Sequence, residues 1–353
     1  MAYISFQPKD SFKTKLYTGT GAEQTISGVG FQPNMTWIKD RDATEAHTLF
    51  DSVRGATKRF YVNTNVAEST SAVSLTSWNS DGFVIGSGGE VNTNTDKFVS
   101  WNWKMATTSG LDLSAGTITP SSYAVDVAAG MGVYKFTGNA VNGATFAHGL
   151  GKAPQFVFCK NVAYSGTWST YHIGTEATSP EDYFLVMDGT ATRSDSADYW
   201  YDTKPSSTLI TLGAHGSVNG SGEEIVCYAF TSIKGFSKFS NFRGNADAGD
   251  APFVYTGFRP SMVIIKCSSA TEAWNMWNDK TPGYNVSNKN LQPNDSNAEQ
   301  TSSAGVKEID ILSNGFRLRG SNSELNKDGG DMIYAAWAAS PFVSSNSRCG
   351  TAF

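Results

Sequence analysis

Short apolar runs separated by Gly, Asn, Asp and Pro recur along the whole chain. In one of them the apolar residues Val99, Trp101 and Trp103 alternate with polar ones, the pattern of a strand whose two faces meet different surroundings. The segments 156–159 and 262–265 are apolar at every position, which predicts strands buried on both faces. Short strands with frequent turn signals predict an all-β chain built from sandwiches or barrels.

The apolar runs repeat in three divergent copies of one unit of about 100 residues. Each copy has a Pro followed six residues later by a Lys, and each ends with a strand that begins six residues after an Asn. Proline cannot donate to a ladder, so we expect it at the first residue of a strand, and we expect the Lys to mark where that strand emerges into solvent. These scaffold pairs are Pro33 and Lys39, Pro154 and Lys160, and Pro260 and Lys266.

Each copy is predicted to form a small, discrete antiparallel β-sandwich. The pattern leaves open whether the three sandwiches surround a common axis or lie in a row. A segment rich in Ser, Thr, Gly and Ala separates the first two copies and is interpreted as a linker. The predicted organisation is an N-terminal arm (1–16), a first copy (17–105), a linker (106–130), a second copy (131–234), a third copy (235–342) and a C-terminal tail (343–353).

Charged residues make up 17% of the 353 residues, and the net charge at pH 7 is -5. Nucleic acids and anionic membranes select for clustered Lys and Arg, so we expect neither as a partner. The apolar runs are far shorter than the ~20 residues that cross a bilayer, so no membrane insertion is expected. The N-terminal residues lack the basic and apolar regions of a signal peptide, which predicts folding in a cytoplasm.

The cysteines and histidines follow no catalytic or metal-binding pattern. The four Cys are far apart in the sequence, so we expect buried thiols rather than zinc ligands or a disulfide framework. None of the four His recurs between copies, and His47 aligns with Trp168 and Trp274, which predicts a packing position. We expect no cofactor, and we predict that the chain is not an enzyme.

Acidic residues in loops are weaker candidates for chemistry. Asp40 and Asp42, or the pair at 223–224, could serve glycoside hydrolysis, which needs two carboxylates ~5–10 Å apart. The acids in 247–250 and 328–331 could surround a calcium ion. Solvated loops and ordinary turn chemistry explain all of them, so no metal site is predicted.

One loop of the first copy, residues 39–55, is the best candidate for a binding site. It places mixed charges beside aromatic residues, a composition suited to contact with a glycan or a protein. The alternative is an intramolecular salt bridge between Asp51 and Arg54. The predicted binding residues are Arg41, His47, Asp51 and Arg54.

Several segments of the sequence resemble a known family. The family comprises virion proteins of tailed marine bacteriophages, of the cyanophage-like and pelagiphage-like kinds. The resemblance covers essentially the whole chain, implies a virion structural or tail-associated protein, and supplies no catalytic residues. The segments that carry it are 2–10, 14–19, 28–33, 49–58, 80–83, 235–239 and 253–260.

Three functions follow as hypotheses. The first is a non-enzymatic virion protein, a tail fibre or a receptor-binding, host-attachment component that is assembled in the host cytoplasm and resides in the virion. The second is a capsid decoration or tail adaptor protein with no receptor role, and the third is a tailspike enzyme that degrades polysaccharide. The expected partners are other virion proteins, further copies of the chain (a trimer is one option) and a host surface glycan or protein.

Overall fold

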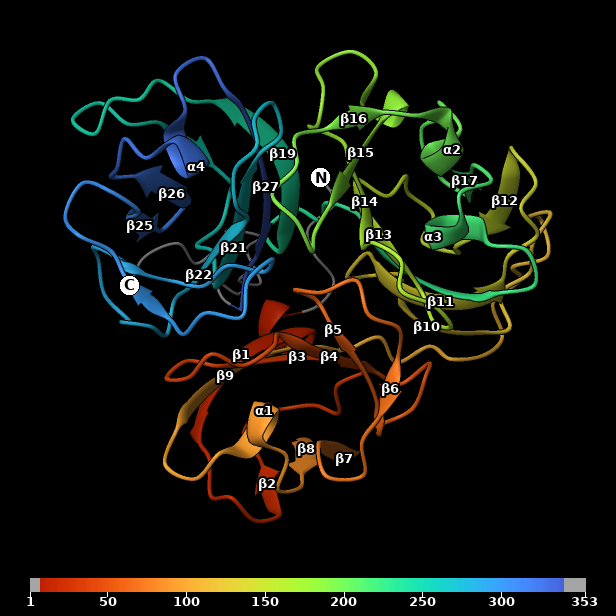
Figure 1. Ribbon diagram of the computed structural model, residues 1–353, viewed down its shortest axis with the longest axis horizontal. Helices are drawn as coiled ribbons and strands as arrows, with labels where there is room; N and C mark the ends of the chain where they lie inside the picture. Colours follow the sequence, from red (N-terminus) through yellow and green to blue (C-terminus); the bar gives the residue numbers. More distant parts are fainter. Residues whose placement is uncertain (1–6, 340–353) are drawn as a thin grey trace.

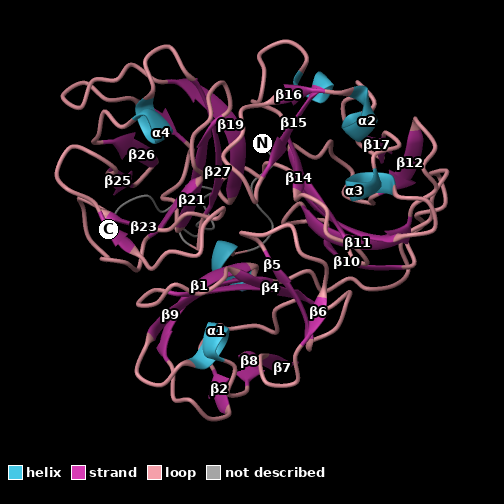
Figure 2. Cartoon of the chain, in the orientation of Figure 1, coloured by secondary structure: helices cyan, strands magenta, loops and turns pink. Residues whose placement is uncertain are grey.

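The computed structural model describes residues 7–339 of the chain. Almost all of its regular structure is antiparallel β-sheet, which confirms the all-β prediction (Figure 2). Figure 1 shows three lobes around a common centre, formed by β1–β9, β10–β18 and β19–β27 and called lobes 1, 2 and 3 here. No helix within the described residues is long and apolar enough to cross a bilayer.

Each lobe is sandwich-like, with a large sheet near the centre and a small sheet outside it (Figure 1). In lobe 1 the order of the large sheet is β1-β9-β3-β4-β5-β6 and that of the small sheet is β2-β8-β7. The bounds are η1 (Pro8–Asp10), β1 (Phe12–Thr18), β2 (Gln24–Ile26), β3 (Met35–Asp40), β4 (Thr48–Asp51), β5 (Lys58–Tyr61), β6 (Ser69–Thr70), β7 (Leu75–Asn79), β8 (Gly82–Ile85), α1 (Gly89–Asn92) and β9 (Lys97–Trp103).

Lobe 2 has the large sheet β10-β11-β18-β13-β14-β15-β16 and the small sheet β12-β17. Its elements are β10 (Ser122–Asp126), β11 (Met131–Thr137), β12 (Ala144–Ala147), β13 (Phe156–Asn161), β14 (Ser169–His172), η2 (Pro180–Asp182), β15 (Tyr183–Val186), β16 (Ser194–Asp195), α2 (Ala197–Trp200), β17 (Leu209–Leu212), α3 (Gly216–Asn219) and β18 (Glu224–Phe230).

Lobe 3 has the large sheet β19-β27-β21-β22, the small sheet β20-β26-β25 and the pair β23-β24. The four central strands therefore follow the same order in all three lobes: β1-β9-β3-β4, β11-β18-β13-β14 and β19-β27-β21-β22. The bounds in lobe 3 are β19 (Ser237–Arg243), β20 (Phe253–Tyr255), β21 (Met262–Cys267), β22 (Asn275–Asn278), β23 (Lys289–Asn290), β24 (Gln300–Thr301), β25 (Ile309–Leu312), β26 (Gly315–Leu318), α4 (Ser323–Asn326) and β27 (Asp331–Trp337).

Two predicted boundaries were wrong. The segment interpreted as a linker (106–130) contains β10, and it buries Leu113 and Ile118 in the core of lobe 2. Its few apolar side chains suffice because the segment lies along the edge of a sheet that is already formed. Residues 12–16 of the predicted arm belong to β1, which pairs with β9 along its whole length. The start of the arm (1–6) and the predicted tail (343–353) lie outside the described residues.

A buried Asn ends the short helix before each closing strand. Its Nδ2 donates to the carbonyl six residues earlier. Its Oδ1 accepts from an amide just beyond the strand that pairs with one side of the closing strand (β1, β11 or β19), so the Asn ties three segments together. Asn92 joins Gly86 and Thr20 (2.6 and 2.8 Å), Asn219 joins Gly213 and Asn139 (3.0 and 2.8 Å), and Asn326 joins Gly320 and Asn245 (3.0 and 2.8 Å).

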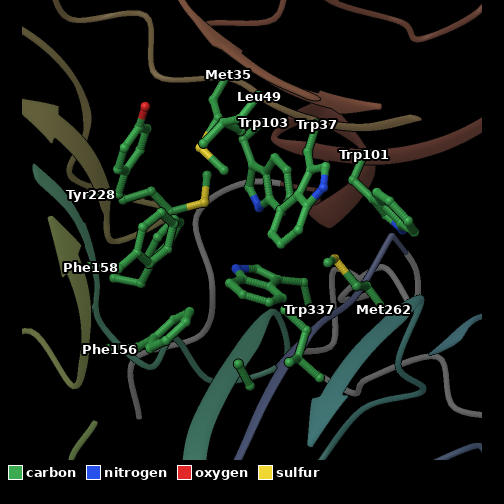
Figure 3. Packing of buried hydrophobic residues seen from close by; sticks show 14 of the residues in the cluster. Met35, Trp37, Leu49, Trp101, Trp103, Phe156, Phe158, Tyr228, Met262 and Trp337 are labelled. Atoms are coloured by element: carbon green, nitrogen blue, oxygen red, sulfur yellow. The ribbon is translucent and has the colours of Figure 1, made fainter. Parts of the chain in front are cut away.

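The large sheets of the three lobes share one central hydrophobic core (Figure 3). Trp101 and Trp103 on β9 point into it, whereas Phe98 on the opposite face packs in the core of lobe 1 alone. The prediction of three discrete sandwiches was therefore wrong, because each large sheet has an apolar face left over after its own sandwich is filled. The members drawn in Figure 3 include Met35, Trp37, Trp103, Phe156, Phe158, Tyr228, Met262 and Trp337.

Hydrogen bonds also connect neighbouring lobes in one direction around the centre. The indole Nε1 of Trp168, in lobe 2, donates to the carbonyl of Tyr61, in lobe 1, over 3.0 Å. The indole Nε1 of Trp274, in lobe 3, donates to the carbonyl of Val186, in lobe 2, over 2.9 Å. Together with the shared core, these contacts join the three lobes into one body.

Candidate functional site

Two of the four predicted binding residues form a buried ion pair. Arg54 Nε lies 2.6 Å from Asp51 Oδ2, and the hydroxyl of Tyr228, in lobe 2, donates to the same oxygen over 2.6 Å. Arg54 also donates to the carbonyl of Leu49 over 3.1 Å, and its guanidinium lies 3.8 Å from the centroid of the Phe60 ring. The intramolecular salt bridge considered as the alternative is thus confirmed within lobe 1, and the hydrogen bond from Tyr228 connects it to lobe 2.

The other two predicted residues also contact the chain itself. Arg41 makes two hydrogen bonds, of 3.0 and 2.7 Å, to the carboxylate of Glu299 in lobe 3. His47 is buried, and its Nδ1 accepts a hydrogen bond from the indole Nε1 of Trp37 over 3.0 Å. All four residues predicted for binding thus make contacts within the chain, and their role in binding a further molecule stays a prediction. The loop's mixture of charge and aromatic residues is that of an interface, but the interface lies between lobes of one chain.

The three scaffold lysines are buried instead of emerging into solvent, which corrects the prediction made for them. Each Nζ donates to backbone carbonyls where loops would otherwise leave oxygen atoms unpaired. Burial lowers the pKa of each ammonium group to about 8. The acceptors are Asp40 and Ala43 for Lys39 (2.6 and 3.1 Å), Asn65 and Gly166 for Lys160 (2.7 Å to Asn65), and Thr190, Ala270 and Glu272 for Lys266 (3.1, 3.2 and 2.6 Å).

Two of these lysines reach into the preceding lobe, because Asn65 belongs to lobe 1 and Thr190 belongs to lobe 2. The partner prolines are buried as well, and each lies two residues before its strand rather than at the strand's first residue. The recurring positions therefore support the fold and do not form a site. These prolines are Pro33, Pro154 and Pro260.

The other three histidines make contacts within the chain. His148 Nδ1 accepts from the amide of Leu150 over 3.1 Å, and His215 Nδ1 accepts from the amide of Ser217 over 3.2 Å. His172 Nδ1 accepts from the amide of Gly174 over 3.0 Å, and its Nε2 lies 3.0 Å from the carbonyl of Tyr334 in lobe 3. Because Nδ1 accepts, the ring of His172 is neutral and carries its proton on Nε2.

A loss of stability below pH 6.5 is expected from His172. Burial lowers its pKa to about 4, below the ~6.5 of an unfolded chain, so the unfolded state takes up a proton first as the pH falls. The stabilisation is fully present above pH ~6.5 and is lost progressively down to pH ~4. Between pH 7 and pH 5 we expect His172 to contribute a loss of about 2 kcal/mol in the free energy of unfolding, measured by urea titration.

The matched variant for this measurement is His172→Gln, which does not titrate and keeps an N–H for the carbonyl of Tyr334. The difference in the free energy of unfolding between wild type and variant should change by about 2 kcal/mol between pH 7 and pH 5. An identical pH dependence in both proteins would contradict the assignment to His172.

Exposed aromatic residues on lobe 3 provide a different candidate. Phe253 and Tyr255 are 48% and 58% exposed, while Val254 between them points into the core of the lobe. They lie on β20, which is an edge strand of its sheet. The two rings therefore project from the same solvent-facing side of a strand whose position is fixed by pairing with β26.

Two half-buried cations border these rings. Lys238 Nζ lies 5.3 Å from the centroid of the Tyr255 ring and donates to the carbonyl of Tyr255 over 2.7 Å. Arg317 is opposite Phe253 on β26, and its Nη2 donates to the carbonyl of Gly249 over 3.0 Å. We call Phe253, Tyr255, Lys238 and Arg317 the aromatic platform.

The aromatic platform is specific to lobe 3. In lobe 1, Ile26 pairs with Phe83 as Val254 pairs with Phe316, so Thr25 and Ser27 occupy the two flanking positions. In lobe 2, the aromatic residue of β12 is Phe146, which is buried. The signal in the sequence is a pair of aromatic residues on either side of an apolar Val. The sequence analysis did not identify it, because it searched for binding residues in loops with mixed charge.

Two hollows in the surface are weaker candidates. The one beside Arg259 and Tyr284 has a volume of about 10 Å³, room for about one water molecule. An open depression of about 320 Å³ lies between Lys9, Lys13 and Asp81. Hydrogen bonds from the amides of Gly28 and Gly30 lower the pKa of Asp81, which therefore stays ionised at neutral pH and does not serve as a general acid.

Comparison with known protein families assigns most of the chain to one family. One family model, described as a domain of unknown function (DUF7483), matches residues 7–341. No curated protein matches the sequence. Within residues 7–339, no three His, Cys, Asp or Glu side chains are grouped so that they could hold a metal ion.

Proposed function

The chain belongs to the DUF7483 family, whose function its description leaves open, and we propose that it is a non-enzymatic structural and host-attachment protein of a bacteriophage virion. The virion setting is supported by the resemblance of segments throughout the sequence. The attachment role is supported by one observation, the exposed pair Phe253 and Tyr255 at the outer edge of lobe 3. The ligand that we propose is a glycan of the host surface.

The chemistry of the aromatic platform favours a glycan. The apolar C–H face of a sugar ring packs against the face of an aromatic ring. The Cα atoms of Phe253 and Tyr255 are about 7 Å apart along the strand, a spacing at which consecutive sugars can cover both rings. Lys238 and Arg317 supply N–H donors at the border for hydroxyl or carboxylate oxygens. A flat edge strand leaves these groups accessible to a chain-like ligand.

A structural role is supported by the way in which the lobes are joined. The central core contains residues from all three lobes. The polar residues that first suggested a site, Asp51, Arg54 and Arg41, hold neighbouring lobes together instead. Such a body keeps its outer surfaces in fixed positions, which suits a component that presents a binding surface on a particle.

We further propose that the three lobes are divergent copies of one unit of about 100 residues. The common order of the four central strands, the buried Asn at the end of the helix before each closing strand and the buried Lys after each Pro support this origin. Other virion proteins and further copies of the chain, with a trimer as one option, are the proposed assembly partners. A capsid decoration or tail adaptor without a receptor role is the alternative.

Loss of glycan binding is expected when both exposed rings are removed. In the double variant Phe253→Ala and Tyr255→Ala, we expect the affinity for purified host-surface polysaccharide to fall about tenfold or more, because each stacked ring contributes on the order of 1 kcal/mol. Binding is measured by calorimetry, and chemical denaturation should show stability within about 0.5 kcal/mol of wild type. The matched control is Tyr201→Ala, which removes a ring that is 43% exposed on lobe 2.

Three other results of this experiment would contradict different parts of the proposal. Wild type that binds neither polysaccharide nor host cells contradicts the attachment role and favours the decoration or adaptor role, to be checked by locating the chain on particles with antibodies. Unchanged binding in the double variant contradicts the aromatic platform as the site. Cleavage of the polysaccharide contradicts the non-enzymatic assignment.

A further inference from the structure

Two cysteines face each other across adjacent strands in lobe 2. Cys159 on β13 is the direct partner of Cys227 on β18 in the antiparallel register. Both are fully buried, and their Sγ atoms are 2.7 Å apart. This separation is well inside the ~3.5–4.0 Å of ordinary contact between heavy atoms.

The register places the pair where cross-strand side chains come closest. The amide of Val162 donates to the carbonyl of Glu224 over 2.9 Å, which makes this pair a hydrogen-bonded one. Hydrogen-bonded and non-hydrogen-bonded pairs alternate along an antiparallel ladder. Cys159 and Cys227 lie three positions further along and therefore form a non-hydrogen-bonded pair, whose Cα separation of ~4.5 Å falls in the range that a disulfide accepts.

The surroundings separate this pair from an ordinary buried thiol. Burial and the neighbouring Cys159 raise the pKa of Cys227, so the pair is not a nucleophilic site in the folded protein. The corresponding strand pairs in the other lobes carry Ile38 opposite Ser100 and Ile265 opposite Tyr334. Cys267, in lobe 3, lies 3.7 Å from the hydroxyl of Ser269 and provides an internal comparison.

We propose that Cys159 and Cys227 are a modification site, at which a small-molecule disulfide such as oxidised glutathione converts the two thiols into an intrachain disulfide. The thiolate of one Cys attacks a sulfur of the oxidant and releases one glutathione thiol. The second Cys then attacks the mixed disulfide, forms the Cys159–Cys227 bond and releases the second glutathione thiol. Two electrons and two protons pass from the protein to the oxidant, which is reduced to two thiols.

Burial determines when the reaction occurs. The oxidant reaches the two sulfur atoms while the strands are unpaired, during folding or transient opening, and not in the closed sheet. A particle that has left a reducing cytoplasm meets such oxidants outside. The disulfide does not depend on glycan binding, so its test is independent of the proposed attachment role; only the encounter with oxidants outside the cell rests on the proposed virion setting.

The test is to refold the denatured full-length chain with reduced and oxidised glutathione and to alkylate the remaining thiols under denaturing conditions. We expect a chain lighter by two hydrogen atoms, one linked peptide pair containing Cys159 and Cys227, and alkylated Cys267 in mass spectrometry. The oxidised protein should melt about 5 °C or more above the reduced protein, because the bond closes a long loop.

The variant Cys159→Ala should lose both the linked peptides and the dependence of the melting temperature on reductant. If this variant does not fold, the comparison of oxidised and reduced wild type decides alone. Full alkylation of Cys159 and Cys227 after oxidative refolding, or linkage of either residue to another cysteine, would overturn the proposal.

Discussion

Replacing Trp337 with alanine is expected to lower the free energy of unfolding by about 3–5 kcal/mol. Trp337 is 1% exposed and lies where the three lobes meet (Figure 3). The substitution leaves a cavity lined by rings that cannot close together, because they are held on the large sheets of three different lobes. The surrounding rings and their centroid distances from Trp337 are Trp103 at 5.7 Å, Phe12 at 6.3 Å, Phe156 at 6.3 Å, Phe230 at 5.5 Å and Phe239 at 5.3 Å.

Chemical denaturation monitored by circular dichroism and by fluorescence measures this loss. Separation of the two transitions in the variant would show that the central core couples the unfolding of the lobes. Tyr284→Ala is the matched control, because Tyr284 is 72% exposed in the same lobe, and its removal should change stability by less than about 0.5 kcal/mol. A loss of about 1 kcal/mol or less for Trp337→Ala would contradict a shared core as the main connection between the lobes.

The second large effect is expected for Asp51→Ala, which should cost about 3–5 kcal/mol in the free energy of unfolding. The side chains of Arg54 and Asp51 are 1% and 0% exposed, so removing the carboxylate leaves a buried guanidinium with less compensation. It also leaves the hydroxyl of Tyr228 without its acceptor. Urea denaturation at neutral pH measures the loss.

A double replacement separates the penalty of an unpaired charge from the value of the pair. In Asp51→Leu with Arg54→Leu neither charge of the pair remains, and Glu68 keeps Lys58 as its partner. We therefore expect stability well above that of Asp51→Ala and within about 2 kcal/mol of wild type. The double-mutant cycle needs Asp51→Leu and Arg54→Leu as its two single variants. If the double variant is as unstable as Asp51→Ala, the loss comes from packing and not from the unpaired charge.

Local pattern was sufficient to predict the central strands that are buried on one or both faces, but it missed the edge strand β10. The run 262–265 is apolar at every position because both faces of β21 are buried, one in the central core and one in lobe 3. The alternating apolar side of β9 contains the residues that reach the centre. The alternation of apolar and polar residues along a strand depends on what each of its faces contacts. This alternation can be read directly from the sequence.

The candidate site could not be predicted in the same way. Arg41, Asp51 and Arg54 lie in a loop with the composition of a binding surface, but their partners are Glu299 and Tyr228, which are distant in the sequence. Whether a polar loop meets another molecule or another part of its own chain depends on packing between lobes. Packing between lobes also explains why the prediction for the lysines failed. Lys160, in lobe 2, donates to the carbonyl of Asn65, which belongs to lobe 1.

The direction of the contacts between lobes has a consequence for assembly. Trp168 and Lys160 reach from lobe 2 to lobe 1, Trp274 and Lys266 reach from lobe 3 to lobe 2, and Arg41 of lobe 1 meets Glu299 of lobe 3. Each lobe thus contacts the preceding one with its donor side chains, and the third such contact returns to the first lobe. The ring is closed, so none of the three lobes has an unmatched contact surface of this kind. A two-lobed version would retain one unmatched end of each kind, the geometry from which open filaments grow. Closure within one chain removes that hazard and leaves the outer faces of the lobes outside these contacts.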